Sequence, residues 1–142
     1  MTPTTIEALR RGWRAEDFRP GMYVRTIADR GGMIVGRPVL KCWPVTLWNK
    51  AFREYETIWI EWELLIPDLN DAATFALALA VLAHRSGLPE SVVPYAWWRW
   101  RDNDRWVLEL AAGTPHRDFV CAEPDPIEAL AVALAQTAEV KP

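Results

Sequence analysis

Residues 95–110 read YAWWRWRDNDRWVLEL, two runs of alternating side chains that meet at a polar Asp-Asn-Asp tip. Two such runs joined by a short polar turn predict a β-hairpin. Because successive side chains of a strand point to opposite sides, the alternation defines two faces. One face holds Ala96, Trp98, Trp100, Trp106, Leu108 and Leu110, and the other holds Trp97, Arg99, Arg101, Arg105, Val107 and Glu109. We expect the first face to pack in the core and the second to be available for binding.

The length and composition indicate a globular chain. It has 142 residues, of which 51% are hydrophobic, and a chain of this length buries roughly two thirds of its unfolded surface. We expect one compact domain or two very small ones, with Cys42 and Cys121 as reduced, buried thiols. The longest apolar run, residues 72–83, is shorter than the roughly 20 residues of a spanning helix, and the first residues lack a secretory-signal pattern. These features predict a cytoplasmic protein that does not enter a membrane.

Charge is distributed unevenly along the chain. Residues 1–53 contain ten basic and four acidic groups, a net charge of +6, whereas residues 54–142 have a net charge of −9. Such an asymmetry favours a polyanionic partner for the basic part, either nucleic acid or an acidic protein surface. The alternative is that the two halves pack together and partly neutralise each other.

The first part of the chain is predicted to be mostly β. Thr4 or Thr5 caps a short N-terminal helix, and residues 22–27 and 33–36 then form a hairpin with its turn at residues 28–32. Residues 39–43 lie between two prolines and read as an edge strand or an extended loop. Residues 45–53 show no clear pattern, and residues 54–66 read as one long strand with Trp59 pointing outward.

The later part is predicted to mix helices and strands. Residues 67–71 supply a cap for a helix over residues 74–83, and Pro126 is the first residue of a last helix. The hairpin and a short strand over residues 118–122 lie between these helices. We therefore predict an α+β fold, with residues 1–68 as a basic, mostly-β part and residues 69–142 as an acidic helix-hairpin-strand-helix unit, or one compact domain that contains both.

Two segments of the first part carry a resemblance. Residues 20–25 (PGMYVR) and 31–36 (GGMIVG) resemble the opening of a KOW-type small β-barrel. This resemblance implies a small barrel in the N-terminal part, of a kind common in proteins that contact RNA polymerase, ribosomes or nucleic acid.

The later part resembles a family of small phage-encoded accessory proteins, in residues 67–74 (PDLNDAAT), the tryptophan-rich hairpin and residues 126–130 (PIEAL). In size and general composition, the whole chain is also similar to small factors of thermophilic phages that bind host RNA polymerase. This second resemblance implies a stoichiometric, non-catalytic protein that docks on the polymerase or its σ factor.

Residue patterns typical of enzymes and metal sites are weak. His84 and His116 are far apart in the sequence and have no cysteine pair nearby, so no metal site is predicted. No phosphate-binding glycine loop or dinucleotide fingerprint is present. Glu61 and Glu63 beside Trp59 offer the residue types of a glycoside hydrolase, but adjacent carboxylates on a strand are more often a solvated surface. We predict no enzymatic activity and no cofactor.

The remaining candidate site is a binding surface rich in tryptophan and arginine. These residues are enriched where binding energy concentrates in protein interfaces, and they also stack on bases and neutralise phosphates. The alternative is that the arginines stack on indoles inside the fold. The candidate partner-binding residues are Trp97, Arg99, Arg101 and Arg105 of the hairpin, Trp59, and Arg10, Arg11 and Arg14.

The expected function is that of a non-enzymatic phage-type regulator that binds a host protein, with RNA polymerase or its σ factor as the expected target. One alternative is a nucleic-acid-binding module whose basic N-terminal half follows phosphates. Another is an anti-defence protein that inhibits a host nuclease complex. Self-association is compatible with each of them.

Overall fold

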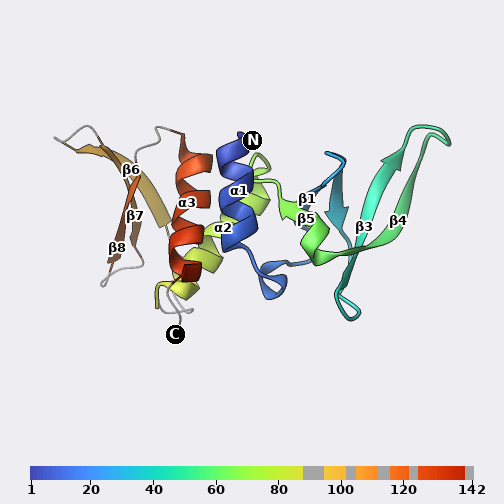
Figure 1. The fold of residues 1–142 in the computed structure, drawn as a ribbon, viewed down its shortest axis with the longest axis horizontal. Helices are drawn as coiled ribbons and strands as arrows, with labels where there is room; N and C mark the ends of the chain where they lie inside the picture. Colours follow the sequence, from blue (N-terminus) through green and yellow to red (C-terminus); the bar gives the residue numbers. More distant parts are fainter. Residues whose placement is uncertain (88–94, 102–104, 112–115, 122–124, 140–142) are drawn as a thin grey trace. The chain divides into compact units, whose positions relative to one another are not determined.

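A computed structural model describes residues 1–87, 95–101, 105–111, 116–121 and 125–139, with the backbone alone for those between 95 and 121 and for Glu139 (Figure 1). The chain divides into two units. Unit 1 combines Met1–Trp13 with Phe75–Pro142, and unit 2 comprises Arg14–Thr74. Helices and antiparallel sheets are both present, and the mostly-β segment lies in the N-terminal part. The predicted α+β class is therefore confirmed.

The boundaries between the two units follow Trp13 and Thr74, whereas the sequence predicts a boundary after residue 68. Because the N-terminal helix belongs with the C-terminal residues, the basic residues 1–53 do not form one unit. Unit 2 contains eight basic and nine acidic groups, and unit 1 contains eight basic and ten acidic groups. The charge asymmetry along the sequence is therefore nearly absent from each folded unit.

Unit 2 contains a five-stranded antiparallel sheet in the order β4-β3-β2-β1-β5. Its strands are β1 (Tyr23–Thr26), β2 (Gly31–Ile34), β3 (Cys42–Asn49), β4 (Glu54–Glu61) and β5 (Leu65–Pro67). The predicted hairpin over residues 22–36 is confirmed as β1 and β2, and the segment without a clear pattern lies largely in β3. The last strand, β5, pairs with the first, β1. This pairing is compatible with a KOW-type barrel, and the barrel stays a prediction.

Two details of this sheet differ from expectation. Gly31 and Gly32 begin β2, and the turn before them places Asp29 at a φ of 59°, a left-handed conformation that aspartate tolerates better than most residues. The predicted long strand over residues 54–66 is wrong beyond Glu61, because the 3-10 turn η2 (Trp62–Leu64) separates β4 from β5. Leu64 of that turn is exposed.

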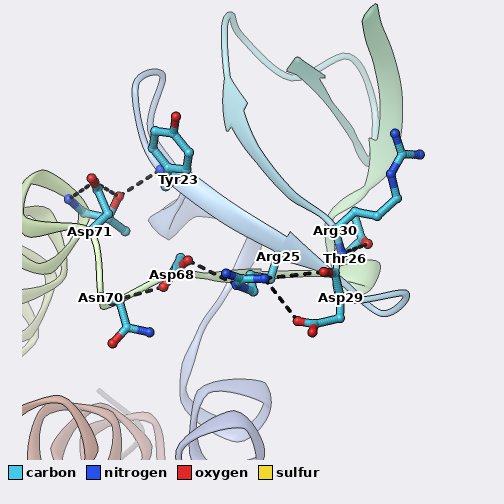
Figure 2. Close-up of polar contacts among 9 residues, drawn as sticks. Tyr23, Arg25, Thr26, Asp29, Arg30, Asp68, Asn70 and Asp71 are labelled. Carbon is cyan, nitrogen blue, oxygen red and sulfur yellow. Dashed lines mark hydrogen bonds and ion pairs between the residues drawn. The ribbon is translucent and has the colours of Figure 1, made fainter. Parts of the chain in front are cut away.

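A polar network joins β1 to β5 and to the start of helix α2 (Ala72–Arg85), as Figure 2 shows. The Arg25 Nε atom lies 3.2 Å from the Asp68 carboxylate, and the other Asp68 oxygen accepts the Asn70 N–H at 3.0 Å. Asp71 caps the helix by accepting the Thr74 N–H at 3.0 Å. The predicted cap between strand and helix is confirmed, and Asp71 provides it.

Unit 1 contains helix α1 (Pro3–Gly12), the residues of α2 from Phe75 onward and helix α3 (Pro126–Glu139). The expected cap at Thr4 or Thr5 is wrong, because Thr2 precedes the helix and accepts the Thr5 N–H at 3.1 Å. The predicted start of the last helix at Pro126 is confirmed.

Helices α1 and α3 run side by side (Figure 1). They approach so closely at Gly12 that a Cβ atom there would lie 2.6 Å from the Ala135 backbone nitrogen. Arg85 of α2 donates to the carbonyl oxygens of Gly12 at 2.6 Å and Leu134 at 3.3 Å. A cation at these carbonyls complements the negative end of α1 and ties three helices together.

The second sheet of the structure lies in unit 1. It is antiparallel and three-stranded, with β6 (Tyr95–Arg101), β7 (Arg105–Ala111) and β8 (His116–Cys121) in sequence order. The predicted hairpin is confirmed as β6 and β7. Its register pairs Trp98 with Leu108 and Trp97 with Glu109, which is the register that the two expected faces require. The predicted strand over residues 118–122 corresponds to β8.

Candidate binding surfaces

The two faces of the unit 2 sheet differ in burial. On one face, the apolar side chains of β1, β2 and β3 form the core, and Val24, Ile34, Val45 and Leu47 are at most 1% exposed. A strand alternates between faces, so the intervening residues lie on the opposite side. That opposite side is the one available for contacts outside the unit 2 core.

The opposite side carries large apolar side chains rather than the polar ones usual on a solvated sheet face. Their exposed fractions range from 37% for Met33 to 72% for Tyr55. The register places Tyr23 beside Met33, Trp48 beside Tyr55, and Pro44 beside Trp59. We call Tyr23, Met33, Trp48, Tyr55 and Trp59 the aromatic face.

The aromatic face is partly preorganised. The rings of Trp48 and Tyr55 meet edge to face, with centroids 5.0 Å apart. Between this pair and Trp59, the hydroxyls of Thr46 and Thr57 are 2.9 Å apart across the same two strands. Aromatic side chains that already contact one another lose little conformational freedom when a partner covers them.

Strand β4 adds an edge to this surface. It is eight residues long and lies at one end of the sheet order, beside β3. An edge strand presents N–H and C=O groups to which another chain can add a strand. Exposed acidic side chains, Glu54 and Glu61, lie at its two ends. The aromatic face and the β4 edge are therefore adjoining features of one surface.

A pocket of about 620 Å³ lies elsewhere in unit 2, among the 3-10 turn η1 (Ala15–Asp17), the loop between β2 and β3, and η2. Phe18 and Trp43 are its buried aromatic residues. The exposed residues around them include Arg19, Arg37 and Lys41. An apolar interior with a few charged groups is typical of a binding site.

The structure distributes the predicted site residues over both units. Trp59 lies on the aromatic face and is exposed, as expected. Arg10 and Arg11 are exposed on α1 in unit 1, whereas Arg14 is half-buried in unit 2 and donates its backbone N–H to Asp17. The three N-terminal arginines thus do not belong to a single unit.

The hairpin residues Trp97, Arg99, Arg101 and Arg105 lie on one face of β6 and β7 by register. Their side chains lie outside the described residues, so the expected exposure of this face stays a prediction. The same holds for Cys121, whereas Cys42 is a free, half-buried thiol.

The candidate residues predicted from the sequence include one member of the aromatic face, Trp59, and no residue of the pocket. Trp48 falls in the segment without a clear pattern, because Pro44 within β3 obscures the strand alternation. The signal for Tyr55 was present, since the alternation of residues 54–61 already places it outward with Trp59. No sequence signal marks the pocket, because its walls come from three segments that only the sheet brings together.

Comparisons of the chain with protein-family models, with curated proteins and with solved structures found no match. Within the described ranges, no helix is both long and apolar enough to cross a bilayer.

Proposed function

We propose that this protein is a non-enzymatic regulator that binds a host protein through the aromatic face, with RNA polymerase or its σ factor as the expected partner. The observation that supports binding is the aromatic face itself: five large side chains at least 37% exposed on one side of a sheet whose other side is core. Several large apolar side chains exposed on one face are typical of interaction sites.

The residue types favour a protein as partner. Tryptophan, tyrosine and methionine are enriched in protein interfaces, and tryptophan and tyrosine are also enriched among the few residues that dominate their binding energy. Trp48, Tyr55 and Trp59 present their side chains from adjacent strands, which gives a rigid platform. The choice of polymerase or σ factor depends on the resemblance to phage factors, and a cytoplasmic location follows from the same proposal.

The nucleic-acid alternative loses its main support. It requires a basic N-terminal half, yet each folded unit has a small net negative charge. The exposed carboxylates of Glu54 and Glu61 also lie at the ends of β4, where a phosphate backbone would be repelled. An inhibitor of a host nuclease complex would use the same kind of surface. This alternative differs from the polymerase-binding regulator only in the identity of the partner.

The hairpin face with Trp97, Arg99, Arg101 and Arg105 is a second contact region under this proposal. It shares the composition of interface hot spots. Because it belongs to unit 1, its contribution can be measured separately from that of the aromatic face.

The test measures binding of the purified full chain to RNA polymerase core enzyme, to holoenzyme and to free σ factor by biolayer interferometry. A Tyr55→Ala/Trp59→Ala variant should bind at least about 100-fold more weakly, because two anchors are removed. The matched control is Ile27→Ala, which removes an exposed apolar side chain in the β1–β2 turn, outside the aromatic face.

Failure of the wild-type chain to bind any polymerase component would contradict the choice of partner. Equal binding by the Tyr55→Ala/Trp59→Ala variant and the wild-type chain would instead contradict the choice of surface. Loss of binding to the polymerase only at high salt would indicate that charged contacts, and not the aromatic face, dominate the interaction.

A further inference from the structure

The inner wall of the unit 2 pocket is formed by aromatic residues of the core. The rings of Phe18 and Trp43 are 5.9 Å apart and inclined by 56°, and these residues are 1% and 6% exposed. Trp62 of η2 lines the same pocket and is half-buried. The pocket volume of about 620 Å³ suits one or two bulky side chains with their backbone. This interior would therefore favour an apolar group over water.

The charged residues that line the pocket are predominantly cationic. Arg19, Arg37 and Lys41 face one acidic group, Glu16. The Arg19 guanidinium donates to the backbone carbonyls of Glu16 and Phe18, which orients it against the pocket wall. Within the described part of the chain, the side chains of Arg37 and Lys41 form no ion pair. Their charges remain available to an anionic partner.

Leu40 lies at the edge of this pocket, with an unfavourable backbone conformation and an exposed apolar side chain. It has a φ of 56° and is 97% exposed. Backbone hydrogen bonds between Val39 and Cys42 in both directions, at 2.9 and 3.0 Å, hold Leu40 and Lys41 in a two-residue turn. Such turns favour glycine or asparagine at positive φ. Leucine here adds strain and gains no burial in the free chain, so the fold alone does not explain it.

We propose that this pocket binds an acidic peptide segment of a partner protein that carries a bulky apolar side chain. The apolar side chain enters between Trp43 and Trp62, carboxylates of the segment pair with Arg37 and Lys41, and Leu40 covers the segment from the turn. The pocket shares no residue with the aromatic face, so this inference does not rest on the proposed function.

The same cations and aromatic rings could in principle suit single-stranded nucleic acid, which stacks bases on exposed rings. The geometry favours a peptide for two reasons. Phe18 and Trp43 are buried and offer no open stacking platform. The exposed tip is aliphatic, formed by Val39 and Leu40, and aliphatic groups gain more from apolar side chains than from bases.

The experiment selects a displayed library of random peptides on the full-length protein and then measures the affinity of the enriched peptides by fluorescence anisotropy. We expect enrichment of peptides that combine aspartate or glutamate with a bulky apolar residue. An Arg37→Glu/Lys41→Glu variant should bind them about ten-fold or more weakly, because close charge pairs become repulsive. The control variant, Lys50→Glu/Arg53→Glu, makes the same charge change at exposed sites outside the pocket and should retain the affinity.

Leu40→Gly provides a second variant that keeps the fold, since glycine suits the turn. It should weaken peptide binding several-fold while its melting temperature does not fall. Enrichment of peptides without acidic residues, or equal binding by wild-type and Arg37→Glu/Lys41→Glu chains, would overturn the proposal. So would failure to enrich any peptide, or displacement of the bound peptides by oligothymidylate at physiological salt.

Discussion

The indole of Trp48 and the phenol ring of Tyr55, on the adjacent strands β3 and β4, meet with their centroids 5.0 Å apart and their planes inclined by 69°. Both side chains are nevertheless exposed. The contact therefore orders two aromatic groups on the surface without burying them, which is what a binding platform requires.

A double-mutant cycle would measure this contact. We expect Trp48→Ala and Tyr55→Ala to show a coupling of about 0.5–1.5 kcal/mol in the free energy of unfolding, because edge-to-face pairs contribute that much beyond burial. Urea unfolding of the two single variants and the double variant provides the values. Strictly additive effects would mean that the two rings do not interact in solution.

For the substitution Gly12→Ala, the close contact between α1 and α3 and the helix propensity of alanine predict opposite effects on stability. Alanine in place of a helical glycine normally stabilises by about 0.5–1 kcal/mol, but a Cβ at Gly12 would meet the Ala135 backbone at 2.6 Å. We expect Gly12→Ala to destabilise unit 1 by about 1–3 kcal/mol. Gly31→Ala is the control, because nothing lies within 4 Å of its added Cβ. Equal unfolding midpoints of both variants and the wild-type chain would contradict the close approach of α1 and α3.

Arg25 contacts two carboxylates that differ in exposure, which gives a matched pair of variants. Its Nε atom lies 3.2 Å from Asp68, whose side chain is 11% exposed, and its Nη1 atom lies 3.3 Å from Asp29, whose side chain is 85% exposed. Asp68→Asn should cost about 1.5–3 kcal/mol, as a hydrogen bond to a charged group does. Asp29→Asn should cost less than about 0.5 kcal/mol, because exposed ion pairs contribute little. Thermal unfolding of both variants checks the order, and a larger loss for Asp29→Asn would contradict it.

The turn at Leu40 predicts a substitution that stabilises. A left-handed backbone costs a non-glycine residue about 1–2 kcal/mol, whereas glycine loses about 0.5–1 kcal/mol in chain entropy. Leu40→Gly should therefore raise the free energy of unfolding by up to about 1.5 kcal/mol. Lys41→Gly, at the neighbouring position without positive φ, should lower it by about 0.5–1 kcal/mol. Destabilisation by both variants would remove the argument that Leu40 is strained.

The hairpin register predicts two different outcomes for neighbouring tryptophans. Trp98→Ala should cost about 3–5 kcal/mol if its face is core, as expected from the sequence. The Trp97→Ala/Arg99→Ala variant should reduce partner binding and leave the melting temperature nearly unchanged. Differential scanning fluorimetry gives the melting temperature of each variant, and the binding assay gives its affinity for the partner. A large loss of stability in the double variant would place the Trp97 face in the core.

Patterns read over a few residues predicted the elements well and the connections less well. The hairpin of β6 and β7, with its register, follows from strict alternation around a polar turn. The 3-10 turn at Trp62–Leu64 does not, because its residues continue the alternating pattern of β4 and the break depends on β5 pairing with β1. Thr2 is the cap instead of Thr4 or Thr5 because the helix begins at Pro3, two or three residues earlier than predicted.

By itself, the sequence determined the α+β class, the hairpins and the outward position of Trp59, since alternation and turn chemistry are local properties. Only the tertiary structure decided that α1 belongs with the C-terminal residues, so that the uneven charge of the sequence is nearly balanced within each unit. It also decided that Trp48, Tyr55 and Trp59 share one face and that Trp43, Leu40 and Trp62 line one pocket. The physical reason is that strand pairing joins residues that are distant along the chain. The backbone hydrogen bonds that form each pair are the same for all residue types, so the sequence of a single strand does not show which strand it pairs with.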